Sequence, residues 1–186
     1  MTGFALHLMR HGAPEIAGRM LGHSDMAPTP QGIAACAAQA EALNVEAIVT
    51  SDLRRARAAA ESIGATRCLP VTIDSRWREL DFGAWDGLST AEIDAEALGR
   101  FWADPDGSPP PNGERWSALI ERVSAAIADL PPRPTLVVTH GGAMRAALAV
   151  LCGFEQRQLW AFDLPNAGLL SLRVWPDSAQ ITGLRP

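Results

Sequence analysis

Two histidines and several arginines follow segments of the sequence that resemble buried strands. Arg10 and His11 come directly after the apolar run at residues 4–9, and His140 follows the run TLVVT. Arginine presents a planar fork of donors that matches phosphate geometry, and histidine can attack phosphorus to form a phosphohistidine. These residue types indicate phosphoryl-transfer chemistry on a phosphate ester.

The chain carries 16 positively charged residues, all of them arginine, and no lysine. This composition excludes Schiff-base lysine enzymes, pyridoxal-phosphate enzymes and Walker-type nucleotide sites. An anion site must then use arginine, histidine or backbone N–H groups. The glycines that follow His140 open an expected helix, whose N-terminus would add such N–H groups. A carboxylic acid such as Glu79 could give the leaving alkoxide its proton.

Strands and helices alternate along the chain, which predicts a three-layer α/β/α sandwich around a mostly parallel sheet. The expected strands cover residues 4–9, 46–50, 69–73, 135–139 and 168–175. The expected helices cover residues 31–43, a segment from Ser51 or Asp52 to Gly64, a segment opening at Ser89, residues 114–130 and residues 141–152. Ligands of such sheets bind beyond the carboxyl ends of the strands, where Arg10, His11 and His140 are expected.

Several further residues carry weaker signals. His7 lies inside the first strand, so we expect a core histidine with a satisfied hydrogen bond. Trp102 and Trp116 are expected in ordinary packing rather than in a lid. We expect Arg54 at the surface, whereas Arg57 could support the phosphate ligands. For His23, in the aperiodic segment 13–30, the rim of a pocket and the plain surface remain alternatives.

Composition bounds the class of protein. The 186 residues are 47% hydrophobic and 20% charged, with a net charge of −5, which predicts one globular domain over residues 1–186. The negative charge disfavours nucleic acid as a partner. The apolar runs are too short for a signal peptide or a membrane span. The three scattered cysteines are expected to be buried, as small apolar side chains in a reducing compartment, so we expect a cytoplasmic protein.

Four ordered blocks resemble the signatures of the histidine phosphatase superfamily, also called phosphoglycerate mutase-like. They are LMRHG at 8–12, TSDLRRARAAAE at 50–61, RELDFGAWDG at 78–87 and VVTHGGAMRAAL at 137–148. The blocks span most of the chain and occur in the order that the family uses. The resemblance implies the phosphoglycerate mutase-like fold.

The resemblance also implies a role for each matched residue. His11 is implied as the nucleophile that becomes phosphorylated, and Glu79 as the proton donor. The residues implied to hold the phosphate are Arg10, Arg55 and His140, together with the backbone around Gly22 and at Gly141. No metal and no cofactor is implied.

Departures from the mutase pattern favour a phosphatase. Leu21 stands where mutases have threonine, the segment APEIAGR lacks their asparagine, and the chain is too short for their insertion. The sequence looks like the α-ribazole phosphatase branch or its broad-specificity relatives, so the expected substrate is a small phosphate ester, with α-ribazole 5'-phosphate as one candidate. A phosphoglycerate mutase, or a non-catalytic binding protein on the same fold, remains the alternative. The oligomeric state is left open, with a homodimer as one option.

Overall fold

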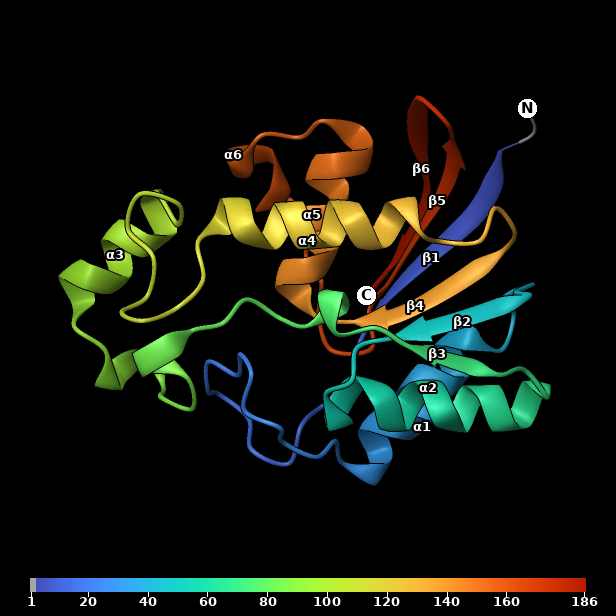
Figure 1. The fold of residues 1–186 in the computed structure, drawn as a ribbon. Helices are drawn as coiled ribbons and strands as arrows, with labels where there is room; N and C mark the ends of the chain where they lie inside the picture. Colours follow the sequence, from blue (N-terminus) through green and yellow to red (C-terminus); the bar gives the residue numbers. More distant parts are fainter. Residues whose placement is uncertain (1–2) are drawn as a thin grey trace.

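The computed structural model describes residues 3–186, and its centre is one six-stranded sheet (Figure 1). The strands are β1 (Phe4–Arg10), β2 (Ala47–Thr50), β3 (Val71–Ile73), β4 (Thr135–Thr139), β5 (Leu169–Trp175) and β6 (Ser178–Arg185). Their order is β3-β2-β4-β1-β5-β6. The first four in that order run parallel, whereas β5 pairs antiparallel with β1 and with β6.

Helices cover both faces of this sheet, which confirms the predicted three-layer sandwich (Figure 1). Helices α1 (Pro30–Ala40) and α2 (Arg54–Arg67) contact each other on one face. Helices α4 (Trp116–Ala128) and α5 (Gly141–Cys152) pair on the other face. Two further helices, α3 (Ala95–Ala103) and α6 (Gln156–Leu159), lie near the ends of α4 and α5.

Alternation along the central strands divides the core between the two faces. In β4, Leu136 and Val138 join the cluster beneath α1 and α2, while Val137 joins the cluster under α4 and α5. In β1, Leu8 and Met9 divide in the same way. Because both faces of these strands are covered, the sequence shows continuous apolar runs instead of a polar alternation. The buried strands fix the positions of the residues that follow them.

The boundaries predicted for α2 are wrong at both ends. The helix begins at Arg54 behind Leu53, without a side-chain cap from Ser51 or Asp52, and it continues through Gly64. A Cβ at Gly64 would lie 2.7 Å from Cγ2 of Val71, so this glycine lets β3 approach the helix. The helix ends at Arg67, because the next residue, Cys68, has a left-handed backbone conformation with φ 55°.

The segment after Ser89 and the C-terminal tail also differ from prediction. Ser89 caps only a 3-10 turn, Thr90–Glu92, and α3 begins later, behind the side chain of Asp94. The expected strand at 168–175 is not the last one, because the chain continues into a further edge strand, β6. The three cysteines are free, and the expectation that all are buried is wrong for Cys68, which is exposed. Across residues 3–186, no helix has both the length and the apolar character needed to cross a bilayer.

Candidate active site

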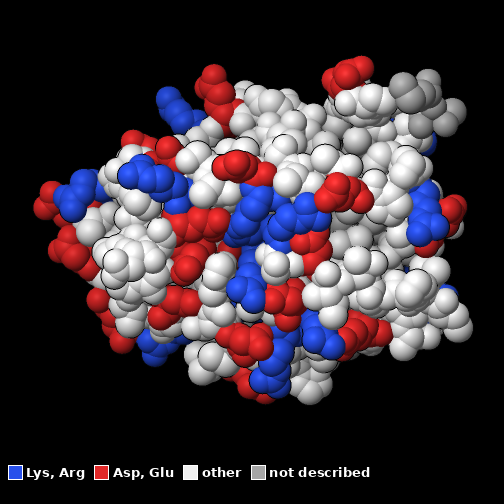
Figure 2. Space-filling view, in the orientation of Figure 1, with Lys and Arg blue, Asp and Glu red and all other residues white. Residues whose placement is uncertain are grey.

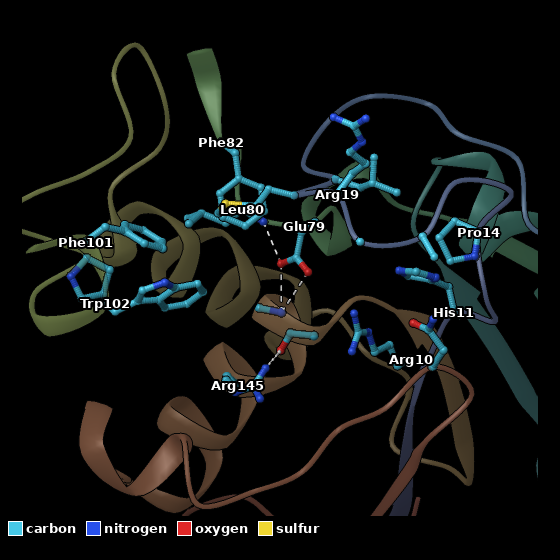
Figure 3. Close-up of a pocket in the computed structure, with 18 of the residues that line it drawn as sticks. Arg10, His11, Pro14, Arg19, Glu79, Leu80, Phe82, Phe101, Trp102 and Arg145 are labelled. Atoms are coloured by element: carbon cyan, nitrogen blue, oxygen red, sulfur yellow. Dashed lines mark hydrogen bonds between the residues drawn. The ribbon is translucent and has the colours of Figure 1, made fainter. Parts of the chain in front are cut away.

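A cavity of about 270 Å³ opens where β1 and β4 end (Figure 3). Arg10 and His11 enter it from the end of β1, Gly141 and Gly142 from the start of α5, and Glu79 from the segment that follows β3. Segments far apart in the sequence meet here because the parallel strands all direct their carboxyl ends to one edge. Three of the four matched blocks contribute residues to this cavity, whereas the block at 50–61, which carries Arg55, does not line it, and neither does His140.

The backbone and the ring of His11 are both fixed by hydrogen bonds. Its N–H donates to the carbonyl of Thr139 at 2.8 Å, and its carbonyl accepts from Ala167 at 3.0 Å. The ring Nδ1 lies 2.7 Å from the carbonyl oxygen of Gly12. A carbonyl oxygen only accepts, so this contact assigns the hydrogen to Nδ1 and leaves the lone pair on Nε2.

The electrostatics of the site keep His11 neutral. Burial, and after it the positive charges of Arg55 and Arg10, lower the pKa of His11 to about 3, against the opposing effect of the hydrogen bond to Gly12. His140 is completely buried, and burial together with the same arginines holds its pKa well below the ordinary range. The two ring centroids are 5.1 Å apart. A neutral imidazole with a free Nε2 is the form that can act as a nucleophile.

Buried nitrogens without hydrogen-bond partners lie around these rings. They include Nε of Arg10, Nε of Arg55 and both ring nitrogens of His140, one of which is a donor and the other an acceptor in the neutral ring. A buried polar group without a partner costs about 1–3 kcal/mol. Arg10 Nε also lies 3.6 Å from the position of a Cβ on Gly141, at the N-terminus of α5. This concentration of donors at a helix N-terminus suits a dianionic phosphate.

Arg55 and Asp86 together hold the turn that contains Gly22. Arg55 is fully buried and donates to the carbonyls of Leu21, Gly22 and Ser24 at 3.0, 2.6 and 2.8 Å. Asp86 accepts from the N–H groups of Gly22 and Ser24 at 2.9 and 2.7 Å. The N–H of Gly22 is therefore already engaged, and it is Leu21, not Gly22, that lines the cavity. A phosphate contact from Gly22 itself stays a prediction.

The carboxyl group of Glu79 lies at the N-terminus of α5. Oε1 accepts from the N–H groups of Leu80 and Gly142, both at 2.9 Å, and Oε2 accepts from Gly142 at 3.1 Å (Figure 3). A Cβ on residue 142 would lie only 2.1 Å from Oε1, so the close approach requires glycine there. The carboxyl group is thus held at a fixed place on the cavity wall.

Three residues of this region were not identified from the sequence: Asp86, Arg122 and Arg145. Arg122 donates to the carbonyl of Glu79 at 2.8 Å and is paired with both carboxylate oxygens of Glu114, which fixes the backbone that carries the acid. Arg145 lines the cavity beside Gly141. Their roles depend on partners that are distant in sequence, so no local pattern could have shown them.

The structure also places the histidines and arginines that carried weaker signals in the sequence. His7 contacts the hydroxyl of Ser171 at 2.8 Å, which confirms a satisfied histidine. Arg54 is exposed as predicted, but Arg57 pairs with Glu61 at the surface, so a supporting role at the site is wrong. His23 does not line the cavity, but its Nε2 lies 3.1 Å from the carbonyl oxygen of Glu79.

The expectation of ordinary packing is wrong for Trp102, which lines the cavity and is 41% exposed. Trp116 packs against the core as predicted, and it lines the cavity as well. Both follow from the way α3 and the start of α4 border the cavity, which periodicity alone does not reveal.

Charge is mixed over the molecular surface. On the face in Figure 2, arginines lie among acidic side chains rather than in one broad positive patch. Within residues 3–186, no three His, Cys, Asp or Glu side chains gather in a way that could hold a metal ion. Arg10 and Arg145 line the cavity and bring positive charge to it.

Comparison with known proteins agrees with this geometry. The family model described as histidine phosphatase superfamily (branch 1) matches residues 6–185. The chain belongs to this superfamily. The family prediction is confirmed, and with it the prediction of an enzyme of the phosphatase class.

Named relatives of this histidine phosphatase differ in substrate. It is 34% identical to glucosyl-3-phosphoglycerate phosphatase of Mycobacterium tuberculosis, over 98% of each chain. It is 31% identical to adenosylcobalamin/alpha-ribazole phosphatase of Escherichia coli, over 84% of this chain and 83% of the relative. It is also 35% identical to a probable phosphoglycerate mutase of Cronobacter sakazakii, over 83% and 79%.

Solved structures confirm the phosphoglycerate mutase-like fold. A putative alpha-ribazole-5'-P phosphatase from Escherichia coli superposes with a TM-score of 0.85 at 27% identity, covering 98% of this chain and 96% of that one. The native mycobacterial glucosyl-3-phosphoglycerate phosphatase gives a TM-score of 0.84 at 29% identity, with 97% of each chain covered. The architecture is shared across relatives named for different substrates.

Proposed function

We propose that this histidine phosphatase is a metal-independent phosphomonoester hydrolase that acts through a phosphohistidine at His11. The observation that carries the proposal is the set of buried, unpartnered donors of Arg10, Arg55 and His140 around a neutral imidazole. The substrate is a small phosphorylated metabolite, in keeping with a cavity just below the usual range of about 300–1,000 Å³.

In the first step Nε2 of His11 attacks the phosphorus, and the bond from phosphorus to the alcohol oxygen breaks. Protonated Glu79 donates its proton to that leaving oxygen, so the alcohol departs neutral. The arginines and His140 stabilise the charge on the other phosphate oxygens. Removing one such donor costs an enzyme about 10²–10³ in kcat, and here the donors are fixed before substrate binds.

In the second step water attacks the phosphohistidine. The carboxylate of Glu79, left ionised by the first step, takes a proton from this water, and the bond from phosphorus to Nε2 breaks. Inorganic phosphate leaves, and His11 returns to its neutral form with the hydrogen still on Nδ1. Glu79 is then protonated again for the next cycle, so each group ends in its starting state.

The natural substrate is the finer part of the proposal. α-Ribazole 5'-phosphate is one candidate, supported by a relative named as an adenosylcobalamin/alpha-ribazole phosphatase. A glucosylated phosphoglycerate is another, supported by the mycobacterial relative.

Release of inorganic phosphate from p-nitrophenyl phosphate and from an alkyl phosphate tests the proposal. We expect turnover of both esters in the presence of EDTA, and Glu79→Gln should slow the alkyl ester more, because only its leaving group needs a proton. Loss of all activity in EDTA would contradict a metal-independent reaction. No turnover on a broad set of phosphate esters would favour a non-catalytic binding protein.

A mutase is the second candidate function, favoured by the relative named as a probable phosphoglycerate mutase. In that reaction the phosphoryl group on His11 passes to a hydroxyl group rather than to water. Phosphoglycerate isomerisation that depends on a bisphosphorylated primer would support the mutase, whereas steady release of inorganic phosphate without a primer supports the hydrolase.

A further inference from the structure

An aromatic wall borders the cavity on the side away from the nucleophile. Three of the chain's six tryptophans line this one cavity, together with two phenylalanines. The wall consists of Phe82, Phe101, Trp102, Trp116 and Trp160. We propose that Trp102 and Trp160 form a binding slot for a planar ring on the alcohol half of the substrate. This inference rests on the proposed hydrolase and deepens it.

The position of the wall follows the direction of the reaction. In an in-line displacement the leaving oxygen lies opposite the attacking nitrogen. In Figure 3, Phe101 and Trp102 lie across the cavity from His11, with Glu79 between them. An ester that places its phosphorus at His11 and its leaving oxygen at Glu79 therefore directs its alcohol toward this wall.

The two tryptophans of the slot are unusually exposed for this protein. Trp102 is 41% exposed and Trp160 is 43% exposed, whereas Trp77 is completely buried. Leaving apolar surface in water costs about 25 cal/mol per Å². Exposed indoles gathered at the mouth of a cavity are typical of a ligand-binding surface.

The rings are held in place without a ligand. Trp102 and Trp160 meet edge to face, with centroids 5.0 Å apart and planes at 85°. The ring centroids of Phe101 and Trp102 are 4.8 Å apart, and the guanidinium carbon of Arg145 lies 4.4 Å from the ring centroid of Trp160. Two rings at a right angle form a corner in which a flat ring can stack on one and meet the edge of the other.

The two arginines near the slot are largely engaged. Arg19 is paired with Glu92, and the guanidinium of Arg145 contacts Trp160 and the carbonyls of Gly141 and Phe162, which leaves its buried Nε without a partner. A sugar with many hydroxyl groups would lose its hydrogen bonds to water here and regain few of them. An aromatic or heteroaromatic ring has no such cost, so the wall favours a ring-bearing alcohol over a polyhydroxylated one.

Three primary alkyl phosphates test the slot on the wild-type enzyme: 2-phenylethyl phosphate, 2-cyclohexylethyl phosphate and glycerol 1-phosphate. All three leaving groups need a proton from the acid, so differences in kcat/KM among the esters report how well the enzyme binds each alcohol. We expect 2-phenylethyl phosphate to exceed glycerol 1-phosphate by about tenfold or more, equal to about 1.4 kcal/mol, and also to exceed the puckered cyclohexyl ester. Equal values for the phenyl and cyclohexyl esters would overturn the planar-ring assignment.

Substitutions of the two tryptophans test whether the preference for the phenyl ester comes from the slot. Trp102→Leu and Trp160→Leu should each bring the ratio of kcat/KM for the phenyl ester over the glycerol ester closer to one. The matched control is Trp175→Leu, at the end of β5, which should keep the wild-type ratio. An unchanged ratio in both slot variants would overturn the proposal. Trp102→Phe keeps an aromatic ring and should keep part of the preference, which separates loss of the ring from a folding defect.

The same assays separate failure of the slot from failure of the proposed function. If the wild type hydrolyses no ester, p-nitrophenyl phosphate included, the proposed function fails as well. If it hydrolyses the esters without preferring the planar ring, only the slot is overturned.

Discussion

The substitution Gly142→Ala tests the placement of the acid without removing any reacting group. The carboxyl of Glu79, the backbone N–H of residue 142 and the imidazole of His11 all remain. The new Cβ would lie 2.1 Å from Oε1 of Glu79, where a normal contact is more than 1 Å longer. Because the contact is with the reacting end of the side chain, the carboxyl group must move by about that distance.

The expected loss follows from this displacement. A catalytic group moved by about 1 Å costs about 10²-fold in rate, so kcat/KM for an alkyl phosphate should fall about 100-fold, or about 2.7 kcal/mol. The loss for p-nitrophenyl phosphate should be much smaller, since its leaving group departs without a proton. The assay is release of inorganic phosphate from both esters under the same conditions.

Gly99→Ala is the matched control for this experiment. Gly99 is also a helical glycine, in α3, and a Cβ there would meet no atom within 4 Å. We expect Gly99→Ala to keep wild-type rates on both esters. Equal losses on the two esters in Gly142→Ala, or no loss on either, would refute the assignment of Glu79 as a proton donor held against the start of α5.

Two further predictions concern the floor of the site. Arg55→Met should lower kcat/KM for every ester by about 10²–10³, because a fixed phosphate donor is lost, and steady-state kinetics showing less than a tenfold loss would contradict this. The second prediction concerns acid. Since the folded pKa of His11 is about 3 and that of His140 is also depressed, the unfolded chain binds protons near pH 6 that the folded chain does not. The free energy of unfolding should then decrease as the pH falls from 6.5 to 4.5, by about 2–3 kcal/mol for His11 alone, and His140 should act in the same direction. Urea denaturation at the two pH values checks this, and a His11→Asn/His140→Asn variant with the same pH slope as wild type would contradict it.

The central strands and the residues that follow them were predictable from the sequence. Strands such as β1 and β4 are buried on both faces, so their continuous apolar runs stand out. Once the strands are placed, parallel topology requires Arg10, His11 and His140 to meet at one edge. The matched blocks add Arg55 and Glu79, which the structure brings to the same region.

Elements with only a weakly buried face were not predicted. Strand β6 is an edge strand whose inward face is half-buried, and its apolar alternation depends on only two residues, Ala179 and Ile181. Gly64 resembles a helix stop, yet its role is to admit β3, which no local pattern reveals. The same reason applies to Asp86, Arg122 and Trp160, because each acts through partners far away in the sequence.

Trapping the phosphorylated enzyme tests the central claim most directly. The protein is mixed with a substrate labelled in its phosphate, quenched within one turnover and digested, and the labelled peptide is located. The proposed mechanism predicts an acid-labile, alkali-stable label on His11, and none in His11→Ala. A label on any other residue, or full turnover by His11→Ala, would contradict it.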